Sequence, residues 1–151
     1  MSVLIRWAEA RDLPTLAQLL ATSPLLQRYR TTYDGALISL EDALAAGDTV
    51  LVADDPPVGL AWLTFAPRML NGAAYLRLLL VVAPGAGLGS QLLAAAENEA
   101  RAQAKHLYLL VTTDNARART FYERHGYRHI GNLPGLVWPD LDEALYHKRL
   151  Q

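Results

Sequence analysis

The chain has 151 residues, of which 52% are hydrophobic, and a formal net charge of −1. This size and composition predict a single globular domain over residues 1–151, and the balanced charge argues against a nucleic-acid partner. The absence of cysteine excludes disulfides, thiolate metal sites and a cysteine nucleophile. An early charge at Arg6 and the lack of a long apolar run predict a cytoplasmic protein that has neither a signal peptide nor a membrane partner.

The first third of the chain is predicted to contain one strand and two helices. Residues 3–8 favour a strand, and Asp12 is expected to cap a helix in which leucines recur at positions 13, 16, 19 and 20. Residues 22–38 have weak periodicity, which indicates an irregular segment or a broken helix. Ser39 is expected to cap a short second helix that ends at Gly47.

Three consecutive antiparallel strands are predicted next. Residues 49–53 and 58–66 are rich in residue types that favour strands, and a stiff turn with two prolines separates them. A second turn, which contains Asn71 and Gly72, leads into a strand over residues 73–82. The two turns therefore predict a meander of three neighbouring strands.

The second half of the chain is predicted to begin with a long helix. This helix is expected from Gly87 to about Lys105, supported by Glu97 and Arg101, which lie four residues apart. A strand over residues 107–113 follows, and the strand–helix–strand order implies a parallel crossover.

The last part of the chain is predicted to hold a helix and two strands joined by a loop. These segments are residues 115–125 for the helix, 127–131 and 144–150 for the strands, and 132–142 for the loop. Either Asp114 or Asn115 is expected to cap the helix, and Gly126 is expected to end it.

The glycine-rich turn over residues 81–90, Val-Val-Ala-Pro-Gly-Ala-Gly-Leu-Gly-Ser, joins an apolar strand to the long helix. Glycines leave backbone N–H groups exposed, and the positive end of the helix dipole adds to them, so the turn suits a phosphate or pyrophosphate. Such glycines also serve tight turns that bind nothing. A dinucleotide fingerprint would need its third glycine at Ser90, and a Walker loop would need a lysine. Ser90 is therefore expected to act as a helix cap or as a phosphate-binding hydroxyl.

The segment after the next strand carries a more specific pattern. Residues 109–127 read Leu-Leu-Val-Thr-Thr-Asp-Asn-Ala-Arg-Ala-Arg-Thr-Phe-Tyr-Glu-Arg-His-Gly-Tyr. This resembles the second signature of the GCN5-related N-acetyltransferase (GNAT) superfamily, with matches at Asn115, Ala118, Phe121, Tyr122, Gly126 and Tyr127. The first signature of that family, Arg/Gln-x-x-Gly-x-Gly/Ala, is matched at Gly87 and Gly89, whereas Pro84 stands in its first position.

The resemblance implies an α/β (α+β) fold, a mixed, mostly antiparallel, bent sheet of six to seven strands flanked by about four helices. Acetyl-CoA would lie where the fourth and fifth strands splay apart. The residues that match the cofactor-binding positions of the family are Leu80, Val81, Val82, Ala86, Gly87, Leu88, Gly89, Ser90 and Asn115. The backbone of the first three would pair with the pantetheine arm, the glycine turn would hold the pyrophosphate, and Asn115 would hydrogen-bond the arm.

The resemblance also implies an N-acetyltransferase that moves an acetyl group from acetyl-CoA to a primary amine by direct attack. The amine would belong to a small molecule, a peptide or a protein, and the sequence leaves this acceptor open. Tyr122 matches the position of the family's proton donor, and a phenol of pKa about 10 can protonate a thiolate whose thiol has a pKa of about 8.5. On spacing alone, Tyr122 would be a core aromatic of its helix.

No general base is predicted. Some members of the family use a glutamate five residues before the motif asparagine, but Leu110 occupies that position here. An alkylammonium of pKa about 10.4 must nonetheless lose a proton before attack. The other ionisable candidates have no motif to support them, and a chain of water molecules is a further option. These candidates are Glu41, Asp42, His106 and Glu143.

The roles of two arginines and of one tryptophan stay open. Arg117 and Arg119 are either surface charges or ligands of the cofactor phosphates, where they would replace the missing motif side chain. Trp138 suits either the acceptor pocket or a homodimer contact, and residues 23–38 and 133–142 are expected to shape the acceptor site.

Three other kinds of site are weighed against this interpretation. A zinc site is not expected, because Gly126 breaks the helix that would have to present His125 and His129 together. An inactive CoA-binding, sensor or assembly module of the same fold is the main alternative to an enzyme. A nucleotide-cofactor enzyme such as a methyltransferase depends on the glycines alone.

Overall fold

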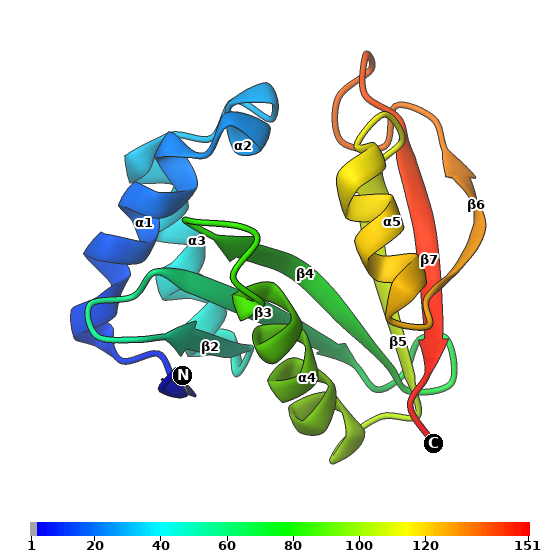
Figure 1. Cartoon of the computed structure of the whole chain (residues 1–151), viewed down its shortest axis with the longest axis horizontal. Coiled ribbons are helices and arrows are strands. Elements are labelled where there is room, and N and C mark those ends of the chain that lie inside the picture. The colour runs from blue at the N-terminus through cyan, green and yellow to red at the C-terminus, as the bar shows by residue number, and fades with distance from the viewer. Residues whose placement is uncertain (1–2) are drawn as a thin grey trace.

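A single sheet of seven strands organises the computed structural model, which describes residues 3–151. The strand order is β1-β2-β3-β4-β5-β7-β6, and the sheet is mixed and mostly antiparallel, as expected (Figure 1). The strands are β1 Ile5–Trp7, β2 Thr49–Ala53, β3 Gly59–Ala66, β4 Ala73–Val81, β5 His106–Thr112, β6 Arg128–Leu133 and β7 Glu143–Arg149. The helices are α1 Leu13–Thr22, α2 Pro24–Arg28, α3 Tyr33–Ala46, α4 Leu88–Arg101 and α5 Ala116–Arg124, with a 3-10 turn at Ala10–Asp12 before α1.

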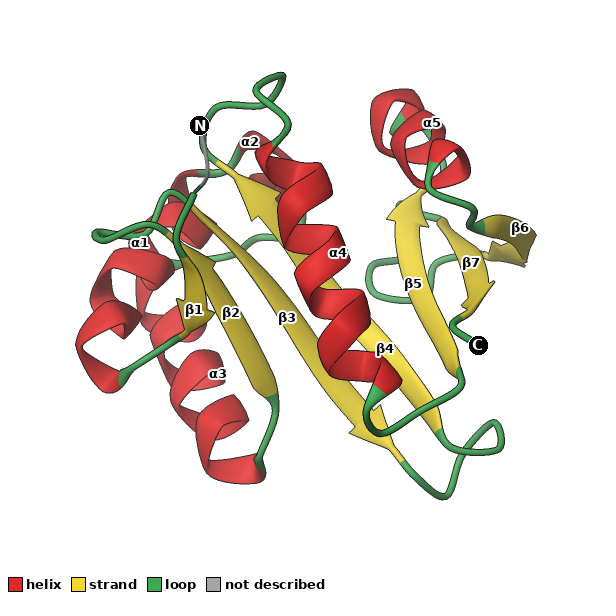
Figure 2. Ribbon diagram, turned by 60° about the horizontal axis from the view of Figure 1, so that its bottom comes forward, coloured by secondary structure: helices red, strands yellow, loops and turns green. Residues whose placement is uncertain are grey.

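The parallel pairing of β4 with β5 covers only part of the two strands. It runs from Ala73 opposite His106 to Leu76 opposite Leu109. Beyond Leu76, β4 continues to Val81 while the two strands diverge (Figure 2). The sheet therefore consists of two parts, β1–β4 and β5–β7, which a short ladder joins at one end.

An inserted residue in β4 lies at the point where the two strands part. In the antiparallel ladder of β3 and β4, Leu63 pairs with Leu76 and Trp62 pairs with Leu78, so Arg77 is the extra residue of a bulge. A bulge bends its strand and increases the local twist. We attribute the divergence of β4 from β5 to this bulge.

The central strands are buried by helices on both faces. Val50 and Val52 of β2 join a core with Leu16 of α1 and Leu40 of α3. The intervening Leu51 lies in the second core, to which α4 and α5 contribute. This alternation is that of a strand covered on both sides. The helices α4 and α5 consequently lie on the same face of the sheet (Figure 1).

Residues 22–38 form a broken helix, one of the two expected alternatives, because α2 and the start of α3 are separated by residues 29–32. The side chain of Thr32 accepts a hydrogen bond from the N–H of Gly35 at 3.1 Å and caps α3. Ser39, the expected cap, lies inside the helix. The buried face of α3 begins at Ala36 and continues to Leu40, and a small residue such as alanine gives a weak periodic signal in the sequence.

Asp12 does not cap α1 with its side chain as expected. Its carboxylate, buried beneath the surface, accepts the N–H of Glu9 at 2.8 Å and two hydrogen bonds from Arg6 at 2.7 and 2.9 Å. Hydrogen bonding to the Arg6 guanidinium holds the pKa of Asp12 below its ordinary value. Asp12 therefore ties the start of α1 to β1.

Glu97 also has a different partner from the one expected. Instead of pairing with Arg101, its buried carboxylate accepts hydrogen bonds from Lys148 at 2.9 Å and from the Tyr127 hydroxyl at 2.8 Å. Arg101 donates to the carbonyl of Leu150 at 2.9 Å. Both side chains thus bind α4 to the C-terminal part of the sheet, which the local spacing of a helix cannot reveal.

Most other expected elements are confirmed. The meander of β2, β3 and β4 is antiparallel, and the crossover through α4 is parallel, although α4 ends at Arg101 and not at Lys105. Asn115 caps α5, and Gly126 follows its end with a φ of 89°. Within residues 3–151 no helix has the length and apolar character that crossing a membrane requires.

The buried Glu97 contact gives a test of the packing between α4 and β7. Lys148→Met should lower the free energy of unfolding by about 1–3 kcal/mol, because it leaves a buried carboxylate without its cation. Urea denaturation measures this difference. Arg149→Gln, the exposed neighbour, should change stability by less than about 0.5 kcal/mol. Equal effects of the two substitutions would contradict the proposed contribution of the pair.

Candidate functional site

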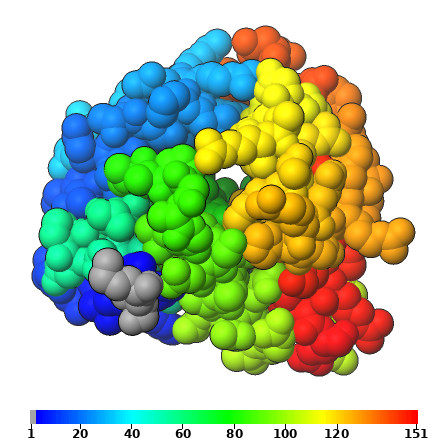
Figure 3. Space-filling model, viewed as in Figure 1, coloured from blue at the N-terminus to red at the C-terminus, as the bar shows by residue number. Residues whose placement is uncertain are grey.

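A cleft of about 910 Å³ opens where β4 and β5 diverge, between the first turns of α4 and one side of α5. Figure 3 shows the surface hollowed between the green residues that begin α4 and the yellow and orange residues of α5. The residues that line the cleft are Leu79, Leu80, Val81, Pro84, Gly85, Gly87, Gly89, Ser90, Asn115, Ala116, Arg117, Ala118, Thr120, Phe121, Tyr122 and Arg124. Most of the residues expected to bind a cofactor are among them.

The edge of β4 offers unpaired backbone groups to this cleft. The N–H of Val82 donates to the carbonyl of Val58 at 2.9 Å, and so points toward β3. Because successive residues of an antiparallel strand direct their backbone groups to opposite sides, Leu80 also faces β3. Leu79 and Val81 face the open edge. Of the three residues expected to pair with a pantetheine arm, Leu80 and Val81 line the cleft together with Leu79, and the exposed Val82 lies outside the lining.

The start of α4 presents three backbone donors. Gly87 adopts a left-handed conformation with φ of 79°, and the first hydrogen bond of the helix runs from the N–H of Gln91 to the Gly87 carbonyl at 3.2 Å. The N–H groups of Leu88, Gly89 and Ser90 therefore precede the helical ladder, and no acceptor within residues 3–151 takes them. Free N–H groups at the positive end of a helix dipole attract an anion.

Two members of the expected glycine-turn set contribute no side chain to the cleft. Ala86 lies exposed outside the lining, and the side chain of Leu88 packs against the core. Gly87, Gly89 and Ser90 line the cleft. The turn therefore faces the cleft through its backbone, in agreement with its lack of charged side chains.

Asn115 connects the cleft to the start of α5. Its side-chain Oδ1 accepts the N–H of Ala118 at 3.1 Å, which orients the amide. The Nδ2 group has no acceptor among the residues that the structure describes, and the residue lines the cleft. A hydrogen-bond donor fixed in this way suits a carbonyl oxygen of a bound molecule.

Tyr122 reaches the cleft from within the core. Its ring packs edge-on against Phe121 and Tyr127, and the residue is only 8% exposed. Its hydroxyl donates to no group within residues 3–151, although the residue lines the cleft. Burial raises the pKa of Tyr122 above the ordinary phenol value of 10.0, so the hydroxyl is protonated at neutral pH.

The two arginines singled out in α5 have different surroundings. Arg117 lines the cleft, but Arg119 is turned inward, where it donates to the Tyr146 hydroxyl at 2.9 Å and to the Thr113 carbonyl at 3.0 Å. Arg124 lines the cleft instead. Its separation of seven residues from Arg117, two helical turns, is a signal that could have identified it.

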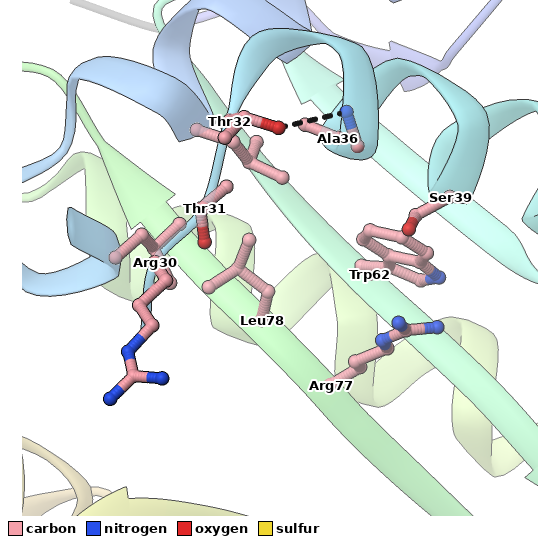
Figure 4. A pocket seen from close by; sticks show the side chains of 11 residues that line it. Arg30, Thr31, Thr32, Ala36, Ser39, Trp62, Arg77 and Leu78 are labelled. Carbon is pink, nitrogen blue, oxygen red and sulfur yellow. Dashed lines mark hydrogen bonds between the residues drawn. The ribbon is translucent and has the colours of Figure 1, made fainter. Parts of the chain in front are cut away.

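A smaller pocket of about 320 Å³ lies on the other side of β4, against α1, α2 and α3. Its lining consists of Leu20, Leu26, Arg30, Thr31, Thr32, Gly35, Ala36, Ser39, Trp62, Arg77 and Leu78 (Figure 4). Six of the eleven lining residues come from the segment 23–38, which was expected to shape an acceptor site. The second expected segment, residues 133–142, is not part of the lining, but its Trp138 stacks on Arg30 with 3.8 Å between the guanidinium carbon and the ring centroid.

Polar contacts join α2 and the residues that follow it to the part of the sheet formed by β5–β7. The Arg28 guanidinium makes two hydrogen bonds of 3.0 Å to Asp114, and the Tyr29 hydroxyl contacts the Thr112 hydroxyl at 2.6 Å. The Trp138 indole donates to the Tyr29 carbonyl at 3.1 Å. These contacts span the gap between β4 and β5 at its open end.

Among residues 3–151, none of the four ionisable residues considered as a general base lines the cleft or the pocket. Glu143 is buried and accepts the Tyr29 hydroxyl at 2.5 Å. Glu41 and Asp42 are exposed on α3, and His106 lies at the opposite end of β5, with its Nδ1 2.9 Å from the Nε2 of His147. Leu110, on β5, supplies no ionisable group.

The sequence matches the family model of the acetyltransferase (GNAT) domain over residues 46–129, which is more than half of the 151-residue chain. No curated protein matches it. Among solved structures, the ribosomal-protein-alanine N-acetyltransferase from Brucella melitensis is 24% identical, with a TM-score of 0.78 over 97% of this chain and 99% of that one.

Two further similar structures hold a bound CoA compound. Naa50 from Arabidopsis thaliana, in complex with the bisubstrate analogue CoA-Ac-MVNAL, is 24% identical, with a TM-score of 0.73 over 98% of this chain and 99% of that one. The yncA protein from Salmonella typhimurium, with its cofactor acetyl-CoA, is 20% identical, with a TM-score of 0.77 over 100% of this chain and 95% of that one. At these identities the similarity shows the shared fold.

The buried Glu143 gives a test of the contacts around α2. Burial raises the pKa of Glu143 above its ordinary value of 4.5, so ionisation of this carboxyl weakens the folded state. The stability of the wild type relative to Glu143→Gln should therefore fall as the pH rises from about 4 to 7. Tyr29→Phe removes the hydroxyl that donates a hydrogen bond to this carboxylate. The pKa of Glu143 should then rise further, so the loss of stability with increasing pH should become steeper. Urea denaturation across the pH range measures the free energy of unfolding of each variant. A wild type that becomes more stable relative to Glu143→Gln as the pH rises would contradict this assignment.

Proposed function

The chain belongs to the GNAT family of acetyltransferases, and we propose that it transfers the acetyl group of acetyl-CoA to a primary amine by direct attack. The acceptor would be a small molecule or an amine of a peptide or protein, and the reaction would take place within one domain. The observation that supports this best is the cleft at the divergence of β4 and β5. There, a free strand edge, an anion-binding helix start and an unpaired tyrosine hydroxyl face one space.

The residues of the cleft fit the parts of acetyl-CoA. The outward backbone groups of Leu79 and Val81 suit the amides of an extended pantetheine arm, as an added strand would. The free N–H groups at the start of α4 suit the pyrophosphate. The Nδ2 group of Asn115, held by its bond to Ala118, suits a carbonyl of the arm.

The missing arginine or glutamine of the first signature has a substitute in this arrangement. Pro84 supplies no hydrogen-bond donor, but Arg117 and Arg124 line the same cleft. Neither makes an ion pair within residues 3–151, so both guanidiniums are available to phosphate oxygens. Binding of the cofactor phosphates would thus combine backbone donors from α4 with side chains from α5.

Tyr122 is proposed as the acid of the reaction. Acetyl-CoA supplies a thioester whose carbon–sulfur bond breaks as the amine nitrogen bonds to the acetyl carbon, which leaves a thiolate to be protonated. The Tyr122 hydroxyl, protonated and without a protein acceptor, would donate that proton and regain one from solvent. Its raised pKa makes the phenol a weaker acid, but the same buried surroundings also disfavour a free thiolate.

The amine is proposed to lose its proton to water. Leu110 supplies no carboxylate, and the ionisable candidates elsewhere do not reach the cleft. An alkylammonium of pKa about 10.4 is neutral in about one molecule in 2,500 at pH 7. Turnover of such an acceptor should therefore be limited by the fraction of neutral amine.

Isothermal calorimetry tests the proposed cofactor and its ligands. CoA and acetyl-CoA should bind, whereas S-adenosylmethionine should give no heat. Arg117→Gln and Arg124→Gln should each weaken CoA binding about fivefold, which is about 1 kcal/mol, while Arg128→Gln on the exposed face of β6 should not. No heat from either CoA species would refute the proposed function. Unchanged affinity in both cleft variants would refute only the role of the arginines.

Steady-state assays of thiol release test the chemistry. Tyr122→Phe should lower kcat by at least about tenfold, whereas Tyr108→Phe, on β5 outside both cavities, should match the wild type. For an alkylamine, kcat/KM should rise about tenfold per pH unit from pH 7 to 9. No descending limb is expected there, because the raised pKa keeps Tyr122 protonated. Wild-type turnover in Tyr122→Phe would remove Tyr122 from the mechanism.

A further inference from the structure

The smaller pocket is lined by two arginines that form no ion pair with any residue that the structure describes. Arg30 and Arg77 both line it, and within residues 3–151 neither guanidinium makes an ion pair or a hydrogen bond. Each lies instead on an indole ring, Arg77 at 4.2 Å from the Trp62 centroid and Arg30 at 3.8 Å from that of Trp138. Stacking orients a guanidinium while leaving its N–H donors free for an anion.

The backbone at both arginines departs from regular structure. Arg77 is the inserted residue of the β4 bulge, and bulges redirect side chains next to active sites. Arg30 has a φ of 61°, a left-handed conformation that is costly for a residue with a side chain and is concentrated at functional sites. In Figure 4 the two side chains lie on opposite sides of Leu78: that of Arg77 extends toward Trp62, and that of Arg30 extends away from the rest of the lining.

The rest of the lining adds donors and no opposing charge. Thr31, Thr32 and Ser39 contribute hydroxyl groups, and no carboxylate belongs to the lining. The fourteen-residue helix α3 begins beside the pocket, so its positive end adds to the field. Two carboxylates lie outside this lining: Asp34 is exposed, and Asp48 accepts the Trp62 indole N–H at 2.9 Å and the Thr64 hydroxyl at 3.0 Å.

The pocket adjoins the cleft along a single strand. Leu78 lines the pocket and Leu79 lines the cleft, and adjacent residues of a strand are only about 3.3 Å apart along it. A molecule held in the pocket is therefore next to the open edge of β4. Its volume of about 320 Å³ is at the lower end of the range for small-molecule sites.

We propose that this pocket binds the acceptor, and that the acceptor is a small primary amine that carries an anionic group, a carboxylate or a phosphate. Arg77, whose guanidinium lies over Trp62 within the lining, would bind the anion, since a guanidinium forms paired hydrogen bonds with both kinds of anion. The amine would then extend toward the gap between β4 and β5. This inference rests on the proposed function, because it identifies the acceptor of the same reaction.

Matched amines test the inference in the assay of thiol release. The pairs are γ-aminobutyrate with butylamine, β-alanine with propylamine, and O-phosphoethanolamine with ethylamine. The wild type should use the anionic member of at least one pair with a kcat/KM at least tenfold above that of its neutral match. The first two pairs report a carboxylate and the third reports a phosphate. Equal values within all three pairs would overturn the inference.

Substitutions assign the preference to the pocket. Arg77→Gln should lower the ratio of anionic to neutral kcat/KM at least fivefold, mainly through KM, and Arg77→Lys should retain part of it. Arg149→Gln, exposed at the far end of β7, should keep the wild-type ratio. A wild-type ratio in Arg77→Gln would overturn the inference. CoA affinity, measured for each variant, reports whether the protein is folded.

A binding measurement decides the case in which no amine of the panel is turned over. With CoA present, N-acetyl-γ-aminobutyrate and N-butylacetamide are titrated while tryptophan fluorescence is recorded, because Trp62 and Trp138 carry the stacked arginines. The carboxylate should bind at least tenfold more tightly than the neutral amide, and failure to do so overturns the inference. CoA binding without any preference for the anion refutes only this inference, whereas no CoA binding refutes the proposed function itself.

Discussion

The parallel ladder between β4 and β5 ends at Leu76 and Leu109, and the positions of both cavities depend on this early end. A complete ladder would pair the backbone of Leu79 and Val81 and close the cleft. The bulge at Arg77 explains why pairing stops there, because an extra residue turns the following part of β4 away from β5. The same residue that separates the strands also directs a guanidinium into the smaller pocket.

Two half-sheets joined by a short ladder need support at their open end, and polar contacts of α2 supply it. The Arg28 pair with Asp114 is exposed on both sides, so it contributes little to stability on its own. The Tyr29 hydroxyl, shared between Thr112 and the buried Glu143, is better shielded. The cleft is therefore bounded by a backbone ladder at one end and by side-chain hydrogen bonds at the other.

The sequence predicted the elements whose signals are local. The strands of the meander, the crossover helix and the Asn115 cap follow from alternation, glycine turns and capping chemistry. The bulge was not predictable, because Arg77 interrupts an apolar run without any turn residue. Arg119 was misjudged for another reason: its partner Tyr146 lies on β7, and contacts between distant segments leave no trace in helical spacing. Arg124, by contrast, was identifiable from its spacing to Arg117.

The distribution of charge distinguishes the two cavities from the rest of the surface. The buried or half-buried carboxylates have partners, as in Asp12 with Arg6 and Glu97 with Lys148. The arginines that line the cavities have none among the residues described. A chain with a net charge of −1 can thus present a positive potential on both sides of one strand, where low-dielectric walls strengthen it. Such a field would attract the phosphates of the cofactor from one side and an anionic acceptor from the other, so that two anions meet at β4 without sharing a binding site.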